Sequence, residues 1–281
     1  MVQKSYTRVT LALDIVKKLQ NGPYAGYHEL AIIKHQIDLF DIVSVKDAPS
    51  LSICCNNPLV PCDNNNICWK AVELVKKEFK IDKSVKIELE KNIPVMGGLA
   101  GGSANAATVL MLLNQFWQLG LSTDQLMQLG RKLGMDVPYY FLGGTAFDSE
   151  ATGVLKKIQT ELKLVFLLAI PDFGVSTGKA YQQINYSLIN IDQEKTALMA
   201  KFLHDGDYHN VLKSMHNDFE HSVFLNYPEL RKIKETMINA GCDQAIMSGS
   251  GSTIMGITDS ISHAQEIQEK VPFKTTVVST L

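Results

Sequence analysis

Hydrophobic and polar residues follow two different periods in the first half of the chain. Residues 5–16 and 31–45 are rich in β-branched and apolar side chains, and residues 85–90 alternate apolar with polar, so these stretches predict strands. Residues 69–79 repeat apolar side chains at helical spacing, with lysines on the opposite face, and predict a helix. Strands and helices are therefore mixed along this half.

The second half continues the mixture. A helix is predicted over residues 122–133, because Ser-Thr-Asp opens this stretch and Gly134 follows it. The continuous apolar run at 164–170 is typical of a central strand. The chain changes character near residue 156, where we expect a second domain to begin, so the predicted domains are 1–155 and 156–281. Further predicted elements are helices over 195–203, 211–215, 228–240 and 261–270, and a strand over 275–278.

A glycine-rich stretch joins the strand at 85–90 to an expected helix at 104–119. Four glycines fall between Pro94 and Ala104, where side chains are absent and several backbone N–H groups can point one way. The free N–H groups and partial positive charge of a helix start suit an anion such as phosphate. Ser103 is either a ligand of phosphate or metal, or an ordinary N-cap. From the residues alone, a phosphate site and a plain glycine-rich turn both stay open.

Composition and charge exclude several classes of function. The 281 residues are 46% hydrophobic and 20% charged, as in ordinary globular proteins, and the net charge of −2 gives no basic field for nucleic acid or anionic membranes. No apolar run approaches the roughly 20 residues of a membrane span, and no signal peptide opens the sequence, so we expect a cytoplasmic protein. The five cysteines match no zinc spacing and predict reduced thiols.

The stretch from Pro94 to Ala104 resembles the phosphate-binding motif of the GHMP small-molecule kinases, whereas the Walker and dinucleotide patterns do not fit it. The resemblance implies ATP and Mg²⁺ as cofactors, with Ser103 as a candidate magnesium ligand. It also implies an α+β, two-domain architecture, with an N-terminal domain like the second domain of ribosomal protein S5 and a ferredoxin-like C-terminal domain. The residues implied to bind ATP are Pro94, Val95, Met96, Gly97, Gly98, Leu99, Ala100, Gly101, Gly102, Ser103 and Ala104.

Two further segments are similar to the diphosphocytidyl-methylerythritol kinase branch of that family. One contains Tyr27 and His28, which the resemblance implies hold a cytosine, and the other contains Asp136, the implied catalytic carboxylate. Without the resemblance, the first segment indicates a turn, and Asp136 indicates a helix N-cap before a proline. The implied reaction is phosphorylation of the 2-hydroxyl of 4-diphosphocytidyl-2-C-methyl-D-erythritol in isoprenoid precursor synthesis. Thr10, Thr177 and Gly249 are further implied substrate ligands.

The chain departs from that branch at two places. Arg8 and Thr10 stand where the branch has Lys and Asn, and Glu150-Ala-Thr-Gly153 stands where it has Gly-x-Gly-Glu. Arg8 keeps the positive charge and is a candidate catalytic cation, or else a strand residue paired with a surface acid. The segment 217–220, Asn-Asp-Phe-Glu, predicts a helix cap or a surface salt bridge rather than catalysis.

Three alternatives to the implied kinase stay open. They are a kinase of the same superfamily for another small alcohol, a nucleotide-binding homologue with weakened turnover, and a plain structural domain. The expected partner is a small cytidyl-linked polyol, with no nucleic acid and no membrane. We expect a monomer or a homodimer.

Overall fold

The computed structural model describes residues 1–191 and 193–281, and the chain forms two compact units. Unit 1 contains residues 1–7, 39–95 and 100–143, and unit 2 contains residues 8–38, 96–99 and 144–281. Two long strands, β1 (Val2–Lys18) and β2 (His28–Ala48), are divided between the units, so that each strand has one part in unit 1 and the other in unit 2. The division of the sequence between residues 155 and 156 stays a prediction.

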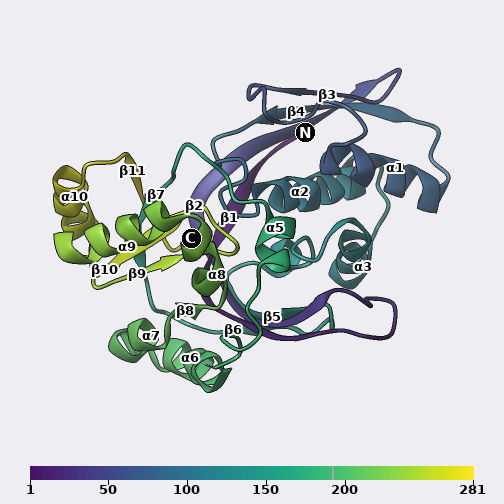
Figure 1. The fold of residues 1–281 in the computed structure, drawn as a ribbon. Coiled ribbons are helices and arrows are strands. Elements are labelled where there is room, and N and C mark those ends of the chain that lie inside the picture. Colours follow the sequence, from purple (N-terminus) through teal and green to yellow (C-terminus); the bar gives the residue numbers. More distant parts are fainter. Residues whose placement is uncertain (192) are drawn as a thin grey trace. The chain divides into compact units, whose positions relative to one another are not determined.

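In unit 1, three helices accompany the sheet strands and pack against one another (Figure 1). Strand β3 (Ser52–Cys55) runs parallel to β4 (Ser84–Glu90), and β4 is antiparallel to the 42–48 part of β2. The helices are α1 (Ile67–Phe79), α2 (Gly101–Phe116) and α3 (Thr123–Leu133), followed by the short α4 (Tyr139–Leu142). The strands and helices predicted for this part of the chain are confirmed.

The helix ends in unit 1 show why these residues form helices. The Asn66 side chain caps α1 by accepting from the Cys68 N–H group at 2.8 Å. A capping box of Ser122 and Gln125 starts α3. Helix α2 begins three residues earlier than predicted, and its N-cap position is Ala100, which offers no side-chain hydrogen bond. Ser103 lies in the first helical turn, so its interpretation as an N-cap is wrong.

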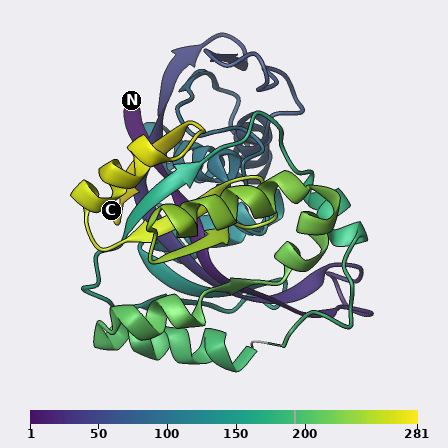
Figure 2. The ribbon, with the colours of Figure 1, turned by 60° about the vertical axis from the view of Figure 1, so that its left-hand side comes forward.

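Unit 2 contains an antiparallel four-stranded sheet in the order β11 (Thr275–Ser279), β7 (Val165–Ala169), β10 (Ile254–Thr258), β9 (Gln244–Met247). Helices α9 (Pro228–Ala240) and α10 (Ile261–Lys270) pack against it (Figure 2). Every residue of β7 is buried. The continuous apolar run is therefore a central strand, as predicted.

Unit 2 also contains three further strands and four further helices among the described residues. Strand β5 (Thr145–Glu150) pairs antiparallel with β2 and with β6 (Leu155–Ile158), and β8 (His216–Asn217) pairs parallel with β1. The helices are α5 (Thr177–Gln182), α6 (Gln193–Asp205), α7 (Tyr208–Ser214) and α8 (Phe219–Asn226). The sequence did not predict the β5–β6 hairpin, because charged residues interrupt its alternation. Within the described ranges, no helix has the length and apolarity to cross a bilayer.

A buried histidine in unit 2 predicts acid sensitivity. The His35 ring nitrogens lie 2.8 Å from the Thr145 hydroxyl and 2.9 Å from the Thr280 hydroxyl. Burial, and secondarily Lys163, lowers the pKa of His35 to about 4. The folded state therefore binds this proton more weakly than the unfolded state, and stability is lost as pH falls from about 6.5 towards 4. The expected loss is about 3 kcal/mol.

Urea unfolding of the wild type and of His35→Gln at pH 7 and pH 4 measures this effect. The variant has no titrating ring at this position, so its free energy of unfolding should fall less between the two pH values. Equal losses in both proteins would contradict the assignment.

Candidate active site

The end of the glycine-rich stretch leads into the start of α2 in unit 1. Ala100 adopts the left-handed backbone conformation, with φ 53°, and α2 follows at once. The first N–H groups of a helix have no acceptor within it, and α2 has no acidic residue in its first turn. The Tyr140 hydroxyl donates to the Ala100 carbonyl at 3.2 Å and holds the entry to the helix. This arrangement favours a bound phosphate.

Gly101 allows the chain before the glycine-rich stretch to pack directly on the helix start. A β-carbon at Gly101 would lie 2.8 Å from the Ile93 side chain and 3.3 Å from the Lys91 ammonium nitrogen. Both distances are shorter than ordinary carbon contacts. A larger residue would therefore push the two ends of the stretch apart.

The turn that carries Asp136 lies beside the same helix start. Asp136 falls between α3 and α4 and is partly exposed. A β-carbon at Gly134, in this turn, would be 3.8 Å from the Ile67 side chain, and one at Gly102, in the first turn of α2, would be 3.9 Å from it. The two turns thus meet at Ile67. The N-cap position of α4 is Pro138, two residues after Asp136.

In unit 2, the middle of the glycine-rich stretch, residues 96–99, contacts the second glycine loop, residues 248–253. The Thr253 N–H group donates to the Gly97 carbonyl at 3.2 Å, and the Ser248 hydroxyl donates to the Gly98 carbonyl at 3.4 Å. Gly98 has φ 75°, and a β-carbon there would overlap the Ser248 carbonyl oxygen. Glycine at position 98 therefore allows the backbones of the two loops to lie in direct contact.

Because of this contact, we expect Gly98→Ala to lower the free energy of unfolding more than an alanine at another glycine with a similarly positive φ. Gly120 is the matched control, because its φ is 67° and it has nothing within 4 Å of the added carbon. Gly120→Ala should cost about 1–2 kcal/mol through φ alone. Gly98→Ala should cost about 1–3 kcal/mol more through overlap. Thermal unfolding of both variants checks the difference, and equal losses would show that the loops separate freely.

Arg8 and Thr10 lie at this junction of loops. The Arg8 guanidinium donates to the Gly98 carbonyl at 2.8 Å and to the Thr10 hydroxyl at 3.4 Å. The Thr10 N–H group donates to the Ser248 hydroxyl at 3.3 Å. Only 5% of Arg8 is exposed. Arg8 places a buried positive charge against the glycine-rich stretch.

Asn217 and Glu220 support the second glycine loop, which the sequence did not predict. The Asn217 amide donates to the Met247 and Gly249 carbonyls at 2.7 and 2.8 Å, and Glu220 accepts from the Met247 N–H group at 2.8 Å. The predicted salt bridge is also present, between Glu220 and Lys234. The loop contacts escaped prediction because the partners are about 30 residues apart, beyond any local pattern.

Aromatic residues gather at His28. Its ring stacks on Tyr181 with centroids 4.7 Å apart, and its Nε2 lies 2.9 Å from the Tyr186 hydroxyl. Burial, with a smaller effect of Lys18, lowers the pKa of His28, which keeps the ring neutral at pH 7. Tyr27 is 54% exposed. The sequence did not single out Tyr186 as a functional residue.

The two other predicted substrate ligands lie in or beside the second glycine loop. The Thr177 hydroxyl is 3.0 Å from that of Ser250, and Gly249 accepts a hydrogen bond from Asn217. Within unit 2 the structure therefore brings Arg8, Thr10, Thr177 and Gly249 to the same pair of loops.

Glu150, the first residue of the segment that departs from the branch, belongs to an ion cluster around a buried lysine. Lys34 is fully buried, and its ammonium nitrogen lies 2.8 Å from the Asp148 carboxylate and 3.0 Å from that of Glu150. Glu150 has φ 50°, a left-handed conformation that glycine adopts more easily. The residue that replaces a family glycine thus carries a carboxylate that partners a buried lysine.

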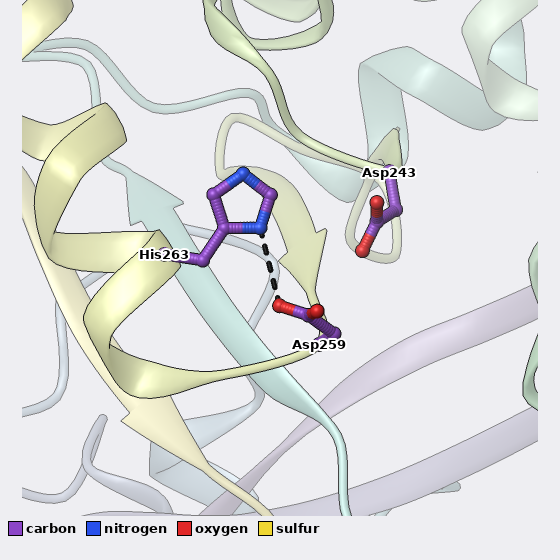
Figure 3. Close-up of side chains that lie close together, drawn as sticks. All are labelled: Asp243, Asp259 and His263. Atoms are coloured by element: carbon purple, nitrogen blue, oxygen red, sulfur yellow. Dashed lines mark hydrogen bonds and ion pairs between the residues drawn. The ribbon is translucent and has the colours of Figure 1, made fainter.

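Three side chains of unit 2 could together ligate a metal ion. Among the described residues, Asp243, Asp259 and His263 form such a group, with their ligand atoms within 4.8 Å of one another (Figure 3). Both carboxylates are exposed and already bonded, Asp243 to the Tyr208 hydroxyl and Asp259 to His263, so we assign no ion there. Ser103 fits magnesium better, since its hydroxyl is partly exposed in the first turn of α2, where a bound phosphate could supply further oxygen ligands.

The chain is similar to known kinases along nearly its whole length. The family described as GHMP kinases N terminal domain matches residues 66–144, and GHMP kinases C terminal matches residues 199–275. The chain is 36% identical to the 4-diphosphocytidyl-2-C-methyl-D-erythritol kinase of Clostridium botulinum, over 96% of this chain and 95% of the relative. It is also 36% identical to the enzyme of that name from Alkaliphilus oremlandii, over 95% and 90%.

Solved structures extend the similarity to the fold. The crystal structure of a 4-(cytidine 5'-diphospho)-2C-methyl-D-erythritol kinase superposes with a TM-score of 0.80 and 25% identity, over 99% of this chain and 98% of that one. The mevalonate kinase of L. major superposes with a TM-score of 0.75 and 16% identity, over 100% and 95%. At that identity, the second match supports the fold alone.

Proposed function

Because the chain belongs to the GHMP kinase family, we propose that it transfers the terminal phosphoryl group of ATP to the 2-hydroxyl of 4-diphosphocytidyl-2-C-methyl-D-erythritol. The relatives named for this reaction are 36% identical over nearly the whole chain. The observation that carries the proposal is that the start of α2 and the turn of Asp136 meet at Ile67. One element suits the phosphates and the other supplies a carboxylate.

The chemistry needs few groups. The backbone N–H groups of residues 94–104 would hold the phosphates, and Arg8 would offset charge on the transferred group. Magnesium, with Ser103 as a ligand, would neutralise the phosphate oxygens of bound ATP. The substrate oxygen bonds to the γ-phosphorus, the bond from phosphorus to the bridging oxygen breaks, and ADP leaves. Asp136 would accept the hydroxyl proton.

The cytidine side of the proposal rests on Tyr27 and His28. A neutral imidazole both donates and accepts hydrogen bonds, as the edge of a pyrimidine requires, and a tyrosine ring can stack on the base. The lowered pKa of His28 favours this neutral form. Thr10, Thr177 and Gly249 would contact the rest of the substrate.

A second candidate is a kinase for another small alcohol. The observation that favours it is the pair Arg8 and Thr10, which replaces the Lys and Asn of the branch and is bonded to the loops. A homologue with weakened turnover is a third outcome of the same change. The cytoplasmic location and the choice between monomer and homodimer stay predictions from the sequence.

ADP release by the purified chain tests these candidates. The assay contains ATP and Mg²⁺ with the cytidyl substrate, with mevalonate or with homoserine, and phosphorus NMR identifies the phosphorylated position. We expect turnover with the cytidyl substrate at its 2-hydroxyl. Turnover with another alcohol alone would support the second candidate. Calorimetric binding of CDP and an ATP analogue without turnover would indicate the third, and no nucleotide binding would overturn the proposal.

A further inference from the structure

A buried carboxylate that the proposed chemistry does not use lies behind the glycine-rich stretch. Asp41, on the unit 1 part of β2, is fully buried and accepts four hydrogen bonds. One oxygen accepts from the Asn92 and Ile93 N–H groups at 2.7 and 2.8 Å. The other accepts from the Asn105 amide at 2.9 Å and from the Lys91 ammonium group. The Lys91 ammonium group also donates to the Asn105 side-chain oxygen at 2.9 Å.

These donors come from both ends of the glycine-rich stretch. Lys91, Asn92 and Ile93 directly precede Pro94, and Asn105 lies in the second turn of α2. The Asn105 amide additionally donates to the Ser5 hydroxyl at 3.1 Å, which anchors the helix start to β1. Asp41 is therefore the common acceptor that joins the chain entering the stretch to the helix that leaves it.

The negative charge of Asp41 is needed to satisfy its four hydrogen-bond donors. An ionised carboxylate only accepts hydrogen bonds, which suits four donors, one of them a buried ammonium group. An asparagine would turn its NH₂ group towards two of these donors in either orientation, and would leave Lys91 without its counter-charge. Lys91 lies close to Gly101, so its displacement would reach the first turn of α2 directly.

We propose that Asp41 is a positioning residue for nucleotide binding, which fixes residues 91–93 against the start of α2 and thereby sets the shape of the phosphate-binding stretch. This inference rests on the proposed function, because it assumes that the stretch binds the ATP phosphates. Asp41 does not touch the nucleotide, since it is fully buried. It acts through Lys91, through the two N–H groups and through Asn105.

Asp41→Asn tests the inference, with Asp38→Asn as its matched control. Asp38 lies three residues earlier on β2, and its carboxylate bonds only to Ser279 among the described residues. Calorimetry measures the Kd of an ATP analogue and, separately, the Kd of CDP. For Asp41→Asn we expect ATP-analogue binding weaker by about tenfold or more, with CDP binding within about twofold of the wild type. Asp38→Asn should change neither.

Asn105→Ala is a second variant in case Asp41→Asn does not fold. It removes one of the four donors and should weaken ATP-analogue binding about threefold without changing CDP binding. The inference is overturned if Asp41→Asn and Asn105→Ala bind the analogue as the wild type does, or if both ligands weaken equally. Failure of the wild type itself to bind the analogue would instead overturn the proposed function, and this inference with it.

Discussion

Asp136→Asn should lower kcat by at least about 100-fold while the Kd of an ATP analogue stays within about twofold of the wild type. The amide keeps the size of the carboxylate but cannot accept the proton of the substrate hydroxyl. Tight packing holds the turn in place, since Val137 is fully buried and Gly134 lies against Ile67, so the variant should fold normally. Single-turnover kinetics with excess enzyme measure the chemical step directly.

Asp124→Asn is the control for charge loss in the same unit. Asp124 is exposed in the first turn of α3, and its replacement should leave kcat unchanged. A normal rate for Asp136→Asn would refute the assignment of Asp136 as proton acceptor. Loss of analogue binding in this variant would show a role in binding rather than in proton transfer.

Lys34→Ala should lower the free energy of unfolding by about 3–5 kcal/mol, because it leaves the Asp148 and Glu150 carboxylates close together without their buried counter-charge. Few single substitutions outside the apolar core have effects of this size. Urea denaturation at pH 7 measures the loss.

The matched control is Lys46→Ala on the same strand. Lys46 pairs with Glu88 at 2.6 Å, but 58% of its side chain is exposed. Solvent screens such a pair, so its loss should cost less than about 1 kcal/mol. Similar losses for the two variants would show that the Lys34 cluster contributes no more than a surface ion pair.

Local patterns were enough to predict most of the fold. The continuous apolar run of β7 and the capping signals of α3 predicted these elements correctly. The glycine-rich stretch was predicted to lead from a strand into a helix, and α2 begins within it at Gly101. These features depend on residues that are neighbours in sequence, so periodicity and turn chemistry reveal them.

The remaining features depend on contacts between distant segments. Asp41 appeared as an ordinary residue of a predicted strand, although its partners lie about 50 to 64 residues away. Asn217 appeared as a helix cap because its bonds to the second glycine loop have no local signature. Glu150 was recognised only as a lost glycine, since its partner Lys34 is on another strand. Sequence spacing alone does not reveal such pairings.

Because strands from the beginning of the chain pack against its C-terminal part, a fragment without them would lack part of its hydrophobic core. Leu13 and Ile32, from β1 and β2, pack in one apolar cluster with Leu167 and Met247. A piece of the chain that begins at residue 156 would keep the four strands of its own sheet but lose this covering. This fragment would expose a large hydrophobic surface and tend to aggregate. Strands from the beginning of the polypeptide are therefore expected to be required for stable folding of its last 126 residues.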